Sequence, residues 1–243
     1  AFDKDLNAPG KELCYRFKNI STWDYEQAIN WIESLNIKIE GVLCFSYGKA
    51  ILTQQKLISY YKLRCGLDDE LLMVMEDKTK LRKLLKENKL SNIMELNLAE
   101  TPICDLRDLR DRRYIVKNKM GGSSKDIYLT KGNDLIDLIK KNVINNDFLV
   151  QEYIRGSDVR VICLIEKKES KFISLLRRES LDQTFFTARL FPLVLDQKEQ
   201  YDYLNIIRKL ACLFGISCGL MRLDLVENEN GKEILEIDFA IGG

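Results

Sequence analysis

The first third of the chain alternates between stretches with helical and with extended spacing of apolar residues. Apolar positions recur every three or four residues over 24–35, which predicts a helix, and the short apolar run at 39–45 predicts a strand. A second helix is expected over 49–63. Because alternating helices and strands are typical of parallel α/β layers, we expect residues 1–75 to form part of such a layer, with its opening elements missing.

From residue 77 onward, one amphipathic helix leads into a region dominated by extended segments. The sequence DKTKLRKLLKE at 77–87 puts its leucines on one side of a helix, so its basic residues are expected to face solvent. The segments at 148–154, 158–165 and 172–176 follow one another through short polar turns, which favours an antiparallel meander. The other expected strands cover 114–117, 126–129, 219–226 and 232–239, and the other expected helices cover 134–143 and 198–214.

Composition narrows the class of protein without identifying a function. Of the 243 residues, 46% are hydrophobic and 31% are charged, with only three prolines, which is typical of a soluble globular fold. The 38 basic residues balance 37 acidic ones without a basic stripe interleaved with aromatics, so we expect no nucleic-acid partner. No apolar run approaches the roughly 18 residues of a membrane span, and the N-terminus lacks a signal region. We therefore expect a cytoplasmic protein without a membrane partner.

The residue types available for catalysis are restricted. Histidine is absent, which removes the imidazole general base and leaves no ligand set for structural zinc. The seven cysteines form no C-x-x-C pair and several lie inside apolar runs, so we expect buried free thiols and no disulfide framework. Any catalysis must therefore depend on lysine, arginine, carboxylates and a hard metal ion.

The loop in KNKMGGSSKDI has the features of a phosphate-binding turn. Lys117 ends a predicted strand, and two glycines and two serines follow before the next strand begins, namely Gly121, Gly122, Ser123 and Ser124. Glycines allow close backbone approach, while N–H groups and hydroxyls donate to phosphate oxygens beside the lysine ammonium. Glycine–serine hairpin loops are common, so an ordinary β-turn is the alternative that this loop alone leaves open.

Three carboxylates gather on the predicted C-terminal hairpin MRLDLVENENGKEILEID. Glu236 and Asp238 are two residues apart and therefore share one face of their strand. A three-residue loop at 229–231 would set Asp224 directly opposite Glu236, whereas a two-residue turn at its end would set Asp224 against Ile237. Carboxylates crowded on one face repel one another, and a hard cation such as Mg²⁺ relieves that repulsion. A solvent-facing strand with harmless charges is the alternative.

Taken in order, these segments resemble the ATP-grasp superfamily from about Ala1 to Gly243. IVKNKMGGSSKDI is similar to the phosphate-covering loop in the form seen in D-alanine:D-alanine ligases, and FLVQEYIRGSDVRV resembles the adenine-binding linker of RimK-type ligases. MRLD and LEID resemble the family's Arg-x-Asp and Glu-x-Asn.

The resemblance implies a mixed α/β and α+β chain. Its ATP-grasp fold would have two α+β subdomains clamping ATP, preceded by a partial Rossmann-like layer. The implied units are the partial Rossmann-like layer at 1–75, a small subdomain with the phosphate loop at 76–150 and a catalytic subdomain with the metal site at 151–243.

The resemblance also implies roles for individual residues. Arg222 and Lys117 would be catalytic, with Arg222 acting on the transferring phosphoryl group and Lys117 neutralising ATP phosphates. The segment 151–154 would meet the adenine edge and Asp158 the ribose. The residues implied in ATP binding are Lys78, Lys117, Gly121, Gly122, Ser123, Ser124, Gln151, Glu152, Tyr153, Ile154 and Asp158. The implied metal ligands are Asp224, Glu236 and Asp238, with Mg²⁺ as the expected ion and Mn²⁺ as the alternative.

Three positions depart from the family's pattern. Asp238 stands where asparagine is usual, which should tighten metal binding or raise the pKa of one ligand through like-charge repulsion. Asp126 stands where a glycine is common, and the segment FAIGG around Ala240 lacks the arginine of many members.

Arg177 and Arg178 at a strand end could pair with a substrate carboxylate, although arginines in such places are usually only solubilising.

The function implied by the resemblance is that of an ATP- and Mg²⁺-dependent ligase. Such an enzyme would activate a carboxylate as an acyl phosphate for attack by an amine, or by a thiol, and would release ADP and phosphate. An ATP-binding regulatory or degenerate module of the same fold, without turnover, is the alternative. The expected partners are small-molecule carboxylate and amine substrates, and assembly into a homo-oligomer is left open.

Overall fold

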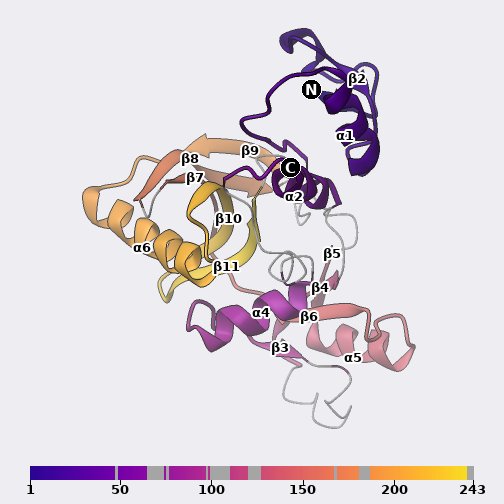
Figure 1. Cartoon of the computed structure of the whole chain (residues 1–243). Coiled ribbons are helices and arrows are strands. Elements are labelled where there is room, and N and C mark those ends of the chain that lie inside the picture. Colours follow the sequence, from indigo (N-terminus) through magenta and orange to yellow (C-terminus); the bar gives the residue numbers. More distant parts are fainter. Residues whose placement is uncertain are drawn as a thin grey trace.

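A computed structural model of the chain divides into three regions of mixed α and β structure. The described residues are 1–46, 49–64, 74, 77–96, 98, 110–119, 127–166, 169–180 and 187–239. In Figure 1, the N-terminal region lies at the upper right, a five-stranded sheet at the left and a four-stranded sheet below them. Helices together with these two sheets give the mixed α and β composition expected from the sequence.

The N-terminal region packs two helices beside a minimal parallel sheet. Its elements are β1 (Phe2–Asp3), the 3₁₀ helix η1 (Lys11–Leu13), β2 (Lys18–Asn19), α1 (Tyr25–Ser34) and α2 (Lys49–Tyr60). Asp24 caps α1, because its side chain accepts a hydrogen bond from the Gln27 N–H. Ala28, Ile32 and Leu57 are buried together, so the helical spacing read from the sequence corresponds to a real core contact.

The strand expected at 39–45 does not form, and that prediction was wrong. Residues 37–45 are all described and contain no strand. Leu43 and Phe45 are 55% and 66% exposed. A strand requires a neighbouring strand for its backbone hydrogen bonds, and β1 with β2 is the only sheet in the described part of this region.

The four-stranded sheet has the order β3–β6–β4–β5, and α5 packs on one of its faces. Its elements are β3 (Glu95–Leu96), β4 (Arg113–Asn118), β5 (Ile127–Lys131), α5 (Gly132–Lys140) and β6 (Phe148–Glu152). All of its strand pairs are antiparallel. Tyr114 and Val116 of β4, Val150 of β6, and Leu135 and Ile136 of α5 form the buried core between helix and sheet.

The five-stranded sheet is antiparallel throughout, in the order β11–β10–β7–β8–β9. Its elements are β7 (Ser157–Glu166), β8 (Glu169–Ser180), β9 (Thr187–Pro192), α6 (Gln197–Leu213), β10 (Cys218–Asn228) and β11 (Gly231–Asp238). Along β7, every second residue of Val159–Ile165 lies in one core with Ile207 and Leu210 of α6. The intervening residues, including Arg160, therefore lie on the opposite face of the sheet.

Residues 153–156 carry the chain from one sheet to the other, so the expected meander was only partly right. β6 pairs within the four-stranded sheet, whereas β7, β8 and the unpredicted β9 form the meander. At Gly156, a Cβ atom would lie 2.5 Å from the Glu227 carbonyl oxygen and 2.5 Å from a Val226 methyl group. Glycine is therefore required where the linker crosses β10.

Helix α4 (Lys78–Glu87) contacts both sheets. The helix expected at 77–87 forms, and Asp77 caps it by accepting from the N–H groups of Thr79 and Lys80. Leu81 and Leu85 are buried in the core of the five-stranded sheet. At the other side, the Lys78 N–H donates to the carbonyl oxygen of Lys119, which follows β4 (3.2 Å). The helix therefore joins the end of β4 to the larger core.

Two expectations from composition can be compared with the structure. Cys44 and Cys163 are buried free thiols, as expected, and burial raises the pKa of both. Cys218 is disulfide-bonded, so the expectation of free thiols was wrong at that position. In the described part of the chain, no helix combines the length and the apolar character needed to cross a bilayer.

Candidate functional site

The β10–β11 hairpin turns through two residues, one fewer than expected. Asn228 pairs with Gly231, which leaves residues 229 and 230 as the turn. The Asn228 side chain accepts from the Asn230 N–H (2.9 Å), and Gly231 has a φ of 126° that disfavours any other residue. The three-residue loop expected at 229–231 was therefore wrong, because an asparagine side chain closes a shorter turn.

A β-bulge further along the hairpin restores the predicted alignment. The register shifts by one residue between Leu225 and Asp224, so that Leu235 is an extra residue on β11. Without the bulge, this turn would set Asp224 against Leu235 and direct Glu236 to the other face. Asp224 in fact lies directly opposite Glu236, as the sequence predicted, and Asp238 follows on the same face.

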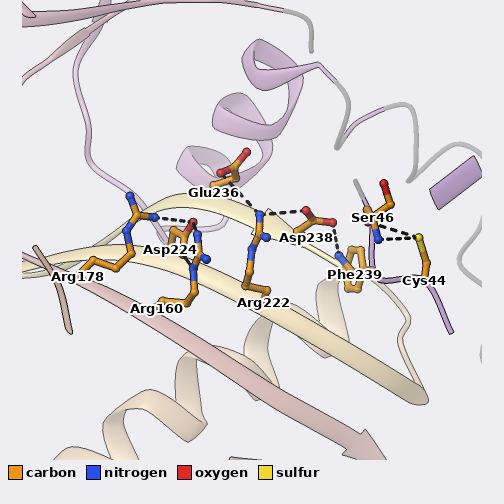
Figure 2. A network of polar contacts seen from close by, with 9 residues as sticks. All are labelled: Cys44, Ser46, Arg160, Arg178, Arg222, Asp224, Glu236, Asp238 and Phe239. Atoms are coloured by element: carbon orange, nitrogen blue, oxygen red, sulfur yellow. Dashed lines mark hydrogen bonds and ion pairs between the residues drawn. The ribbon is translucent and has the colours of Figure 1, made fainter. Parts of the chain in front are cut away.

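Asp224 is held by two arginines from the neighbouring strands. Arg160 on β7 donates through Nε to Oδ1 (2.8 Å) and through Nη2 to Oδ2 (3.0 Å), as Figure 2 shows. Arg178 on β8 donates through Nη1 to Oδ2 (3.0 Å). The Asp224 side chain is only 7% exposed, so these charge-assisted bonds form in a poorly solvated place. The repulsion expected at this carboxylate is therefore compensated by cations.

Arg222 lies between the other two carboxylates of the hairpin. Its Nη2 is 3.0 Å from Asp238 Oδ2 and 4.0 Å from Glu236 Oε2 (Figure 2). Arg222 and Asp238 are buried, whereas the Glu236 side chain is 49% exposed. A guanidinium that approaches both carboxylates is positioned to act on negative charge brought to the same place.

The donor set of the hairpin suits Mg²⁺, although the three carboxylates are not gathered around one point. Among the described residues, no three acidic or cysteine side chains are close enough together to hold a metal ion. Glu236 and Asp238 flank one Arg222 nitrogen, and Mg²⁺ needs only one or two carboxylates when water and phosphate complete its shell. Asp224 would have to exchange its arginine partners to join them. Convergence of all three carboxylates on a bound ion therefore stays a prediction.

The N-terminal region reaches this site at Cys44. Figure 2 shows Cys44 and Ser46 beside the end of β11, where Asp238 accepts from the Phe239 N–H (2.8 Å). Burial raises the pKa of the Cys44 thiol, the hydrogen bond with Ser46 lowers it, and the charge of Asp238 raises it. Residues near 44–46 therefore border the carboxylates of the hairpin.

Lys117 lies on β4 as a poorly solvated cation. Burial, followed by the positive charges of Arg82 and Lys78, lowers the pKa of Lys117 to about 7, although Glu236 and Glu95 oppose the shift. Within the part of the chain that the structure describes, Lys117 makes no ion pair. A desolvated cation without a counter-ion favours the binding of an anion.

Lys78, the second lysine predicted to contact phosphate, opens α4 in the same electrostatic environment. Burial lowers the pKa of Lys78, whereas Glu236 and Asp77 raise it. Glu236 also acts on the pKa of Lys117, so one carboxylate influences both lysines. The structure therefore brings the two predicted phosphate contacts into the neighbourhood of a predicted metal ligand.

Arg82 is a residue that sequence reasoning placed wrongly on a solvated helix face. It is 3% exposed, and its two terminal nitrogens donate to the carbonyl oxygens of Ile234 and Leu235 on β11. Burial lowers the pKa of Arg82 to about 10, so it stays charged at neutral pH. One signal was present in the sequence, because Arg82 lies one helical turn after Lys78 and beside the apolar Leu81.

An open pocket of about 590 Å³ lies beside the linker between the sheets. Three of the four residues predicted at the adenine edge line it. The lining residues are Glu152, Tyr153, Ile154, Arg155, Asn228, Glu229, Asn230 and Glu233. Gln151, the fourth, is buried, and its amide donates to Glu95 (2.8 Å). The Tyr153 N–H donates to the Arg113 carbonyl oxygen (2.8 Å). The Gln151 amide and the Tyr153 N–H therefore already form hydrogen bonds within the protein.

Of the remaining predicted site residues, the structure describes Asp158 but not the residues of the glycine–serine loop. Asp158, predicted to meet the ribose, lies opposite Arg178 in the sheet. Burial raises the pKa of Asp158, while Arg178 lowers it and Asp224 raises it. Outside the described residues lie the predicted loop residues Gly121, Gly122, Ser123 and Ser124, together with Asp126 and Ala240.

Comparison with known proteins finds one family. A family model described as an ATP-grasp domain matches residues 75–242. No curated protein matches the sequence. Many solved structures are similar, although their identities to this chain are low enough that the likeness concerns the fold alone.

Three of these structures illustrate the match. The L-amino acid ligase from Bacillus licheniformis has a TM-score of 0.69 at 18% identity, covering 94% of this chain and 57% of that one. An N5-carboxyaminoimidazole synthetase from Staphylococcus aureus, complexed with ADP, has a TM-score of 0.68 at 14% identity, covering 98% of this chain and 62% of that one. A D-alanine–D-alanine ligase from Bacillus anthracis has a TM-score of 0.61 at 18% identity, covering 94% and 77%. This chain therefore spans less than two thirds of the length of the first two proteins. The family match and these structures confirm the expected ATP-grasp fold.

Proposed function

Because this chain belongs to the ATP-grasp domain family, we propose that it binds ATP and Mg²⁺ and ligates a small carboxylate to a nucleophile. The similar structures support a ligase, since two of those described are named as ligases and a third holds ADP. In the reaction that we propose, ATP phosphorylates the carboxylate, and an amine or a thiol then displaces phosphate from the acyl phosphate.

One observation carries the proposal, namely that two poorly solvated lysines lie close enough to Glu236 of the hairpin for its charge to act on both. Phosphoryl transfer to a carboxylate brings two anions together, so a catalyst must supply positive charge and correct positioning. Lys117 is a desolvated cation without an ion pair among the described residues, and Lys78 lies in the same environment near Glu236. The phosphates of ATP would supply the negative counter-charge that no described residue gives Lys117 in an ion pair.

The residues of the hairpin would handle the transferring phosphoryl group. We assign Arg222 to the negative charge that develops on its oxygens, because the guanidinium already lies between Glu236 and Asp238. Asp224, Glu236 and Asp238 would hold Mg²⁺, and the ion would add positive charge between the phosphates. Mn²⁺ prefers the same oxygen ligands and is the alternative ion.

The other end of the nucleotide would lie along the linker. The backbone of residues 151–154 would read the adenine edge, supported by the pocket beside Tyr153 and Ile154. Asp158 would accept a hydrogen bond from the ribose. Gly121, Gly122, Ser123 and Ser124 would cover the phosphates and exclude water, which matters because acyl phosphates hydrolyse.

The proposal is tested by measuring ADP release in a screen of amino acids and other small carboxylates, each with and without an amine or a thiol. ADP that appears only when both a carboxylate and a nucleophile are present supports the ligase. ADP with a carboxylate alone indicates an enzyme that stops at phosphorylation. A higher melting temperature with ATP and Mg²⁺, without ADP in any mixture, would instead indicate a nucleotide-binding module. No effect of ATP on melting would contradict the proposal altogether.

A further inference from the structure

We propose that Arg82 is a positioning residue for the metal-binding carboxylates, because it fixes the β-bulge that sets their register. This inference rests on the metal role proposed above for Glu236 and Asp238. Arg82 would act without contacting the metal or the substrate itself. Its contribution would be to keep the hairpin in the one register that presents Glu236 on the same face as Asp224.

The hairpin combines two registers that differ by one residue. Between the turn and Leu225, the two strands pair in the register that the two-residue turn sets, and Leu225 lies opposite Ile234. From Asp224 back towards Arg222, the register is shifted by one residue, and Asp224 lies opposite Glu236. Leu235 is the point where the two registers meet, so the position of Glu236 depends on the bulge that accommodates this residue.

Arg82 makes contacts that specifically fit the bulge. In a regular strand, successive carbonyl groups point to opposite sides, so one side chain meets only every second carbonyl. Arg82 donates to the carbonyl oxygens of two successive residues, Ile234 and Leu235. Both carbonyls can face one guanidinium because the bulge turns successive peptide groups to the same side. Loss of the bulge would therefore remove one of the two acceptors.

These carbonyls need Arg82 because of their place in the sheet. Among the described strands, β11 pairs with β10 alone and forms the sheet edge. Ile234 is 1% exposed, so water is poorly placed to replace a protein donor on that edge. Arg82 provides two donors in a fixed fork, and Leu81 and Leu85 hold its helix against the same core. A rigid helix thus supplies the hydrogen bonds that a further strand would otherwise give.

The experiment measures Mn²⁺ binding in the presence of ADP, by electron paramagnetic resonance of the unbound ion. Arg82→Met should weaken Mn²⁺ binding on the order of 10- to 100-fold, as is typical for residues that orient metal ligands. Lys83→Met is the matched control, because the Lys83 side chain is on the same helix but 77% exposed. This control should bind Mn²⁺ as the unchanged protein does.

A deletion separates positioning from a direct effect of the Arg82 charge. Removing Leu235 eliminates the extra residue, so that the two-residue turn alone sets Asp224 opposite Glu236 in a regular ladder. The deletion should restore most of the Mn²⁺ affinity of Arg82→Met. Weak binding that persists in the combined variant would show that Arg82 acts through its charge, and the proposal would be overturned.

The outcomes also separate this inference from the proposed function. If the unchanged protein binds no Mn²⁺ with ADP, the proposed metal site fails, and this inference fails with it. If the unchanged protein binds Mn²⁺ and Arg82→Met binds it equally well, only this inference is wrong. Should Arg82→Met not fold, Arg82→Gln keeps one donor for one carbonyl. It should show a smaller loss that the same deletion restores, and an absence of loss would count against the proposal.

Discussion

The four-stranded and the five-stranded sheet both present charged side chains near the candidate site, but they compensate these charges differently. In the five-stranded sheet, the buried carboxylate of Asp224 accepts from Arg160 and Arg178. In the four-stranded sheet, burial and nearby cations lower the pKa of Lys117 to about 7, and no described residue forms an ion pair with it. Asp224 therefore has its counter-ions within its own sheet, whereas Lys117 has none in ion-pair contact among the described residues.

This difference indicates which features depend on a ligand. A network with internal counter-ions keeps its geometry without a ligand, and its loss should reduce stability. A desolvated cation contributes little to stability, and its loss should reduce affinity for an anion. The predictions below test this division, beginning with the residue that acts on both groups of charges.

The largest effect is expected for Glu236→Gln, because Glu236 lies near Arg222 and also acts on both lysines. We expect ADP release to fall on the order of 100-fold or more, since one anionic ligand and its electrostatic influence are lost. The fold should persist, because the Glu236 side chain is 49% exposed. Glu87→Gln is the control, because the Glu87 side chain at the end of α4 is 59% exposed and lies outside the proposed site. Undiminished ADP release in Glu236→Gln would remove this residue from the metal site.

The next effect concerns the stability of the compensated network. Arg160→Met would leave the buried Asp224 with Arg178 alone, and breaking such a buried pair typically costs about 3 kcal/mol. We expect the free energy of unfolding, measured with urea, to fall by about 2 to 3 kcal/mol. Arg177→Met, an exposed neighbour of Arg178 on β8, should change it by less than about 0.5 kcal/mol. Equal stability of the two variants would contradict internal compensation at Asp224.

The opposite pattern is expected for Lys117→Met. Removing a charge–phosphate contact should weaken ATP binding about 10- to 100-fold, measured by calorimetry. The melting temperature without ATP should stay unchanged or rise, because the variant removes a desolvated cation that forms no ion pair with any described residue. Lys131→Met on β5, which is exposed, should leave ATP affinity unchanged. A large loss of stability with intact ATP binding would show that Lys117 serves the fold.

A smaller effect should appear in the pH dependence of ATP binding. Lys117 has a pKa of about 7, and a phosphate beside it would raise that pKa towards its ordinary value of 10.5. At pH 8 the lysine would therefore take up a proton when ATP binds, and affinity should fall as the pH rises above about 7. Calorimetry in two buffers of different ionisation enthalpy measures this uptake. Lys117→Met should show less uptake, and equal uptake would assign the proton elsewhere.

The smallest effect is expected for Asp158→Ala, which tests the ribose end of the nucleotide. Loss of one hydrogen bond to a charged acceptor should weaken ATP binding about tenfold. Inorganic triphosphate has no ribose, so its affinity should be nearly unchanged. Equal losses for ATP and triphosphate would mean that Asp158 acts through Arg178 and the neighbouring network, and would contradict the ribose assignment.

Elements with many periodic residues could be predicted from the sequence. The helix expected over 198–214 is observed as Gln197–Leu213, because its apolar face packs on a large core that the pattern records. β3 has only two residues, which leaves no period to detect. The apolar run at 39–45 had the pattern of a strand but lacks a strand partner, and a partner is a property of the fold.

The candidate site could be predicted in part, and its alignment was right for an incorrect reason. Asp224 does lie opposite Glu236, but a two-residue turn and a bulge at Leu235 produce the same alignment as the expected three-residue loop. Sequence patterns record side-chain faces and do not reveal a one-residue irregularity that another element stabilises. Arg82 was missed for the same reason, since its acceptors are backbone carbonyls of a strand about 150 residues away.

The close contact at Gly156 has a mechanical consequence. The β10 backbone fills the space beside this residue, so the linker lies directly against the five-stranded sheet there and would serve as the pivot of a rotation between the two sheets. Lys117 pairs with Leu149, roughly seven residues before Gly156, and seven extended residues reach at most about 20 to 25 Å from the pivot. A rotation of about 5° would then move Lys117 by nearly 2 Å, while residues at the linker would hardly move. Small angular changes would be amplified at the phosphate end of the nucleotide, with the adenine end as the stationary reference.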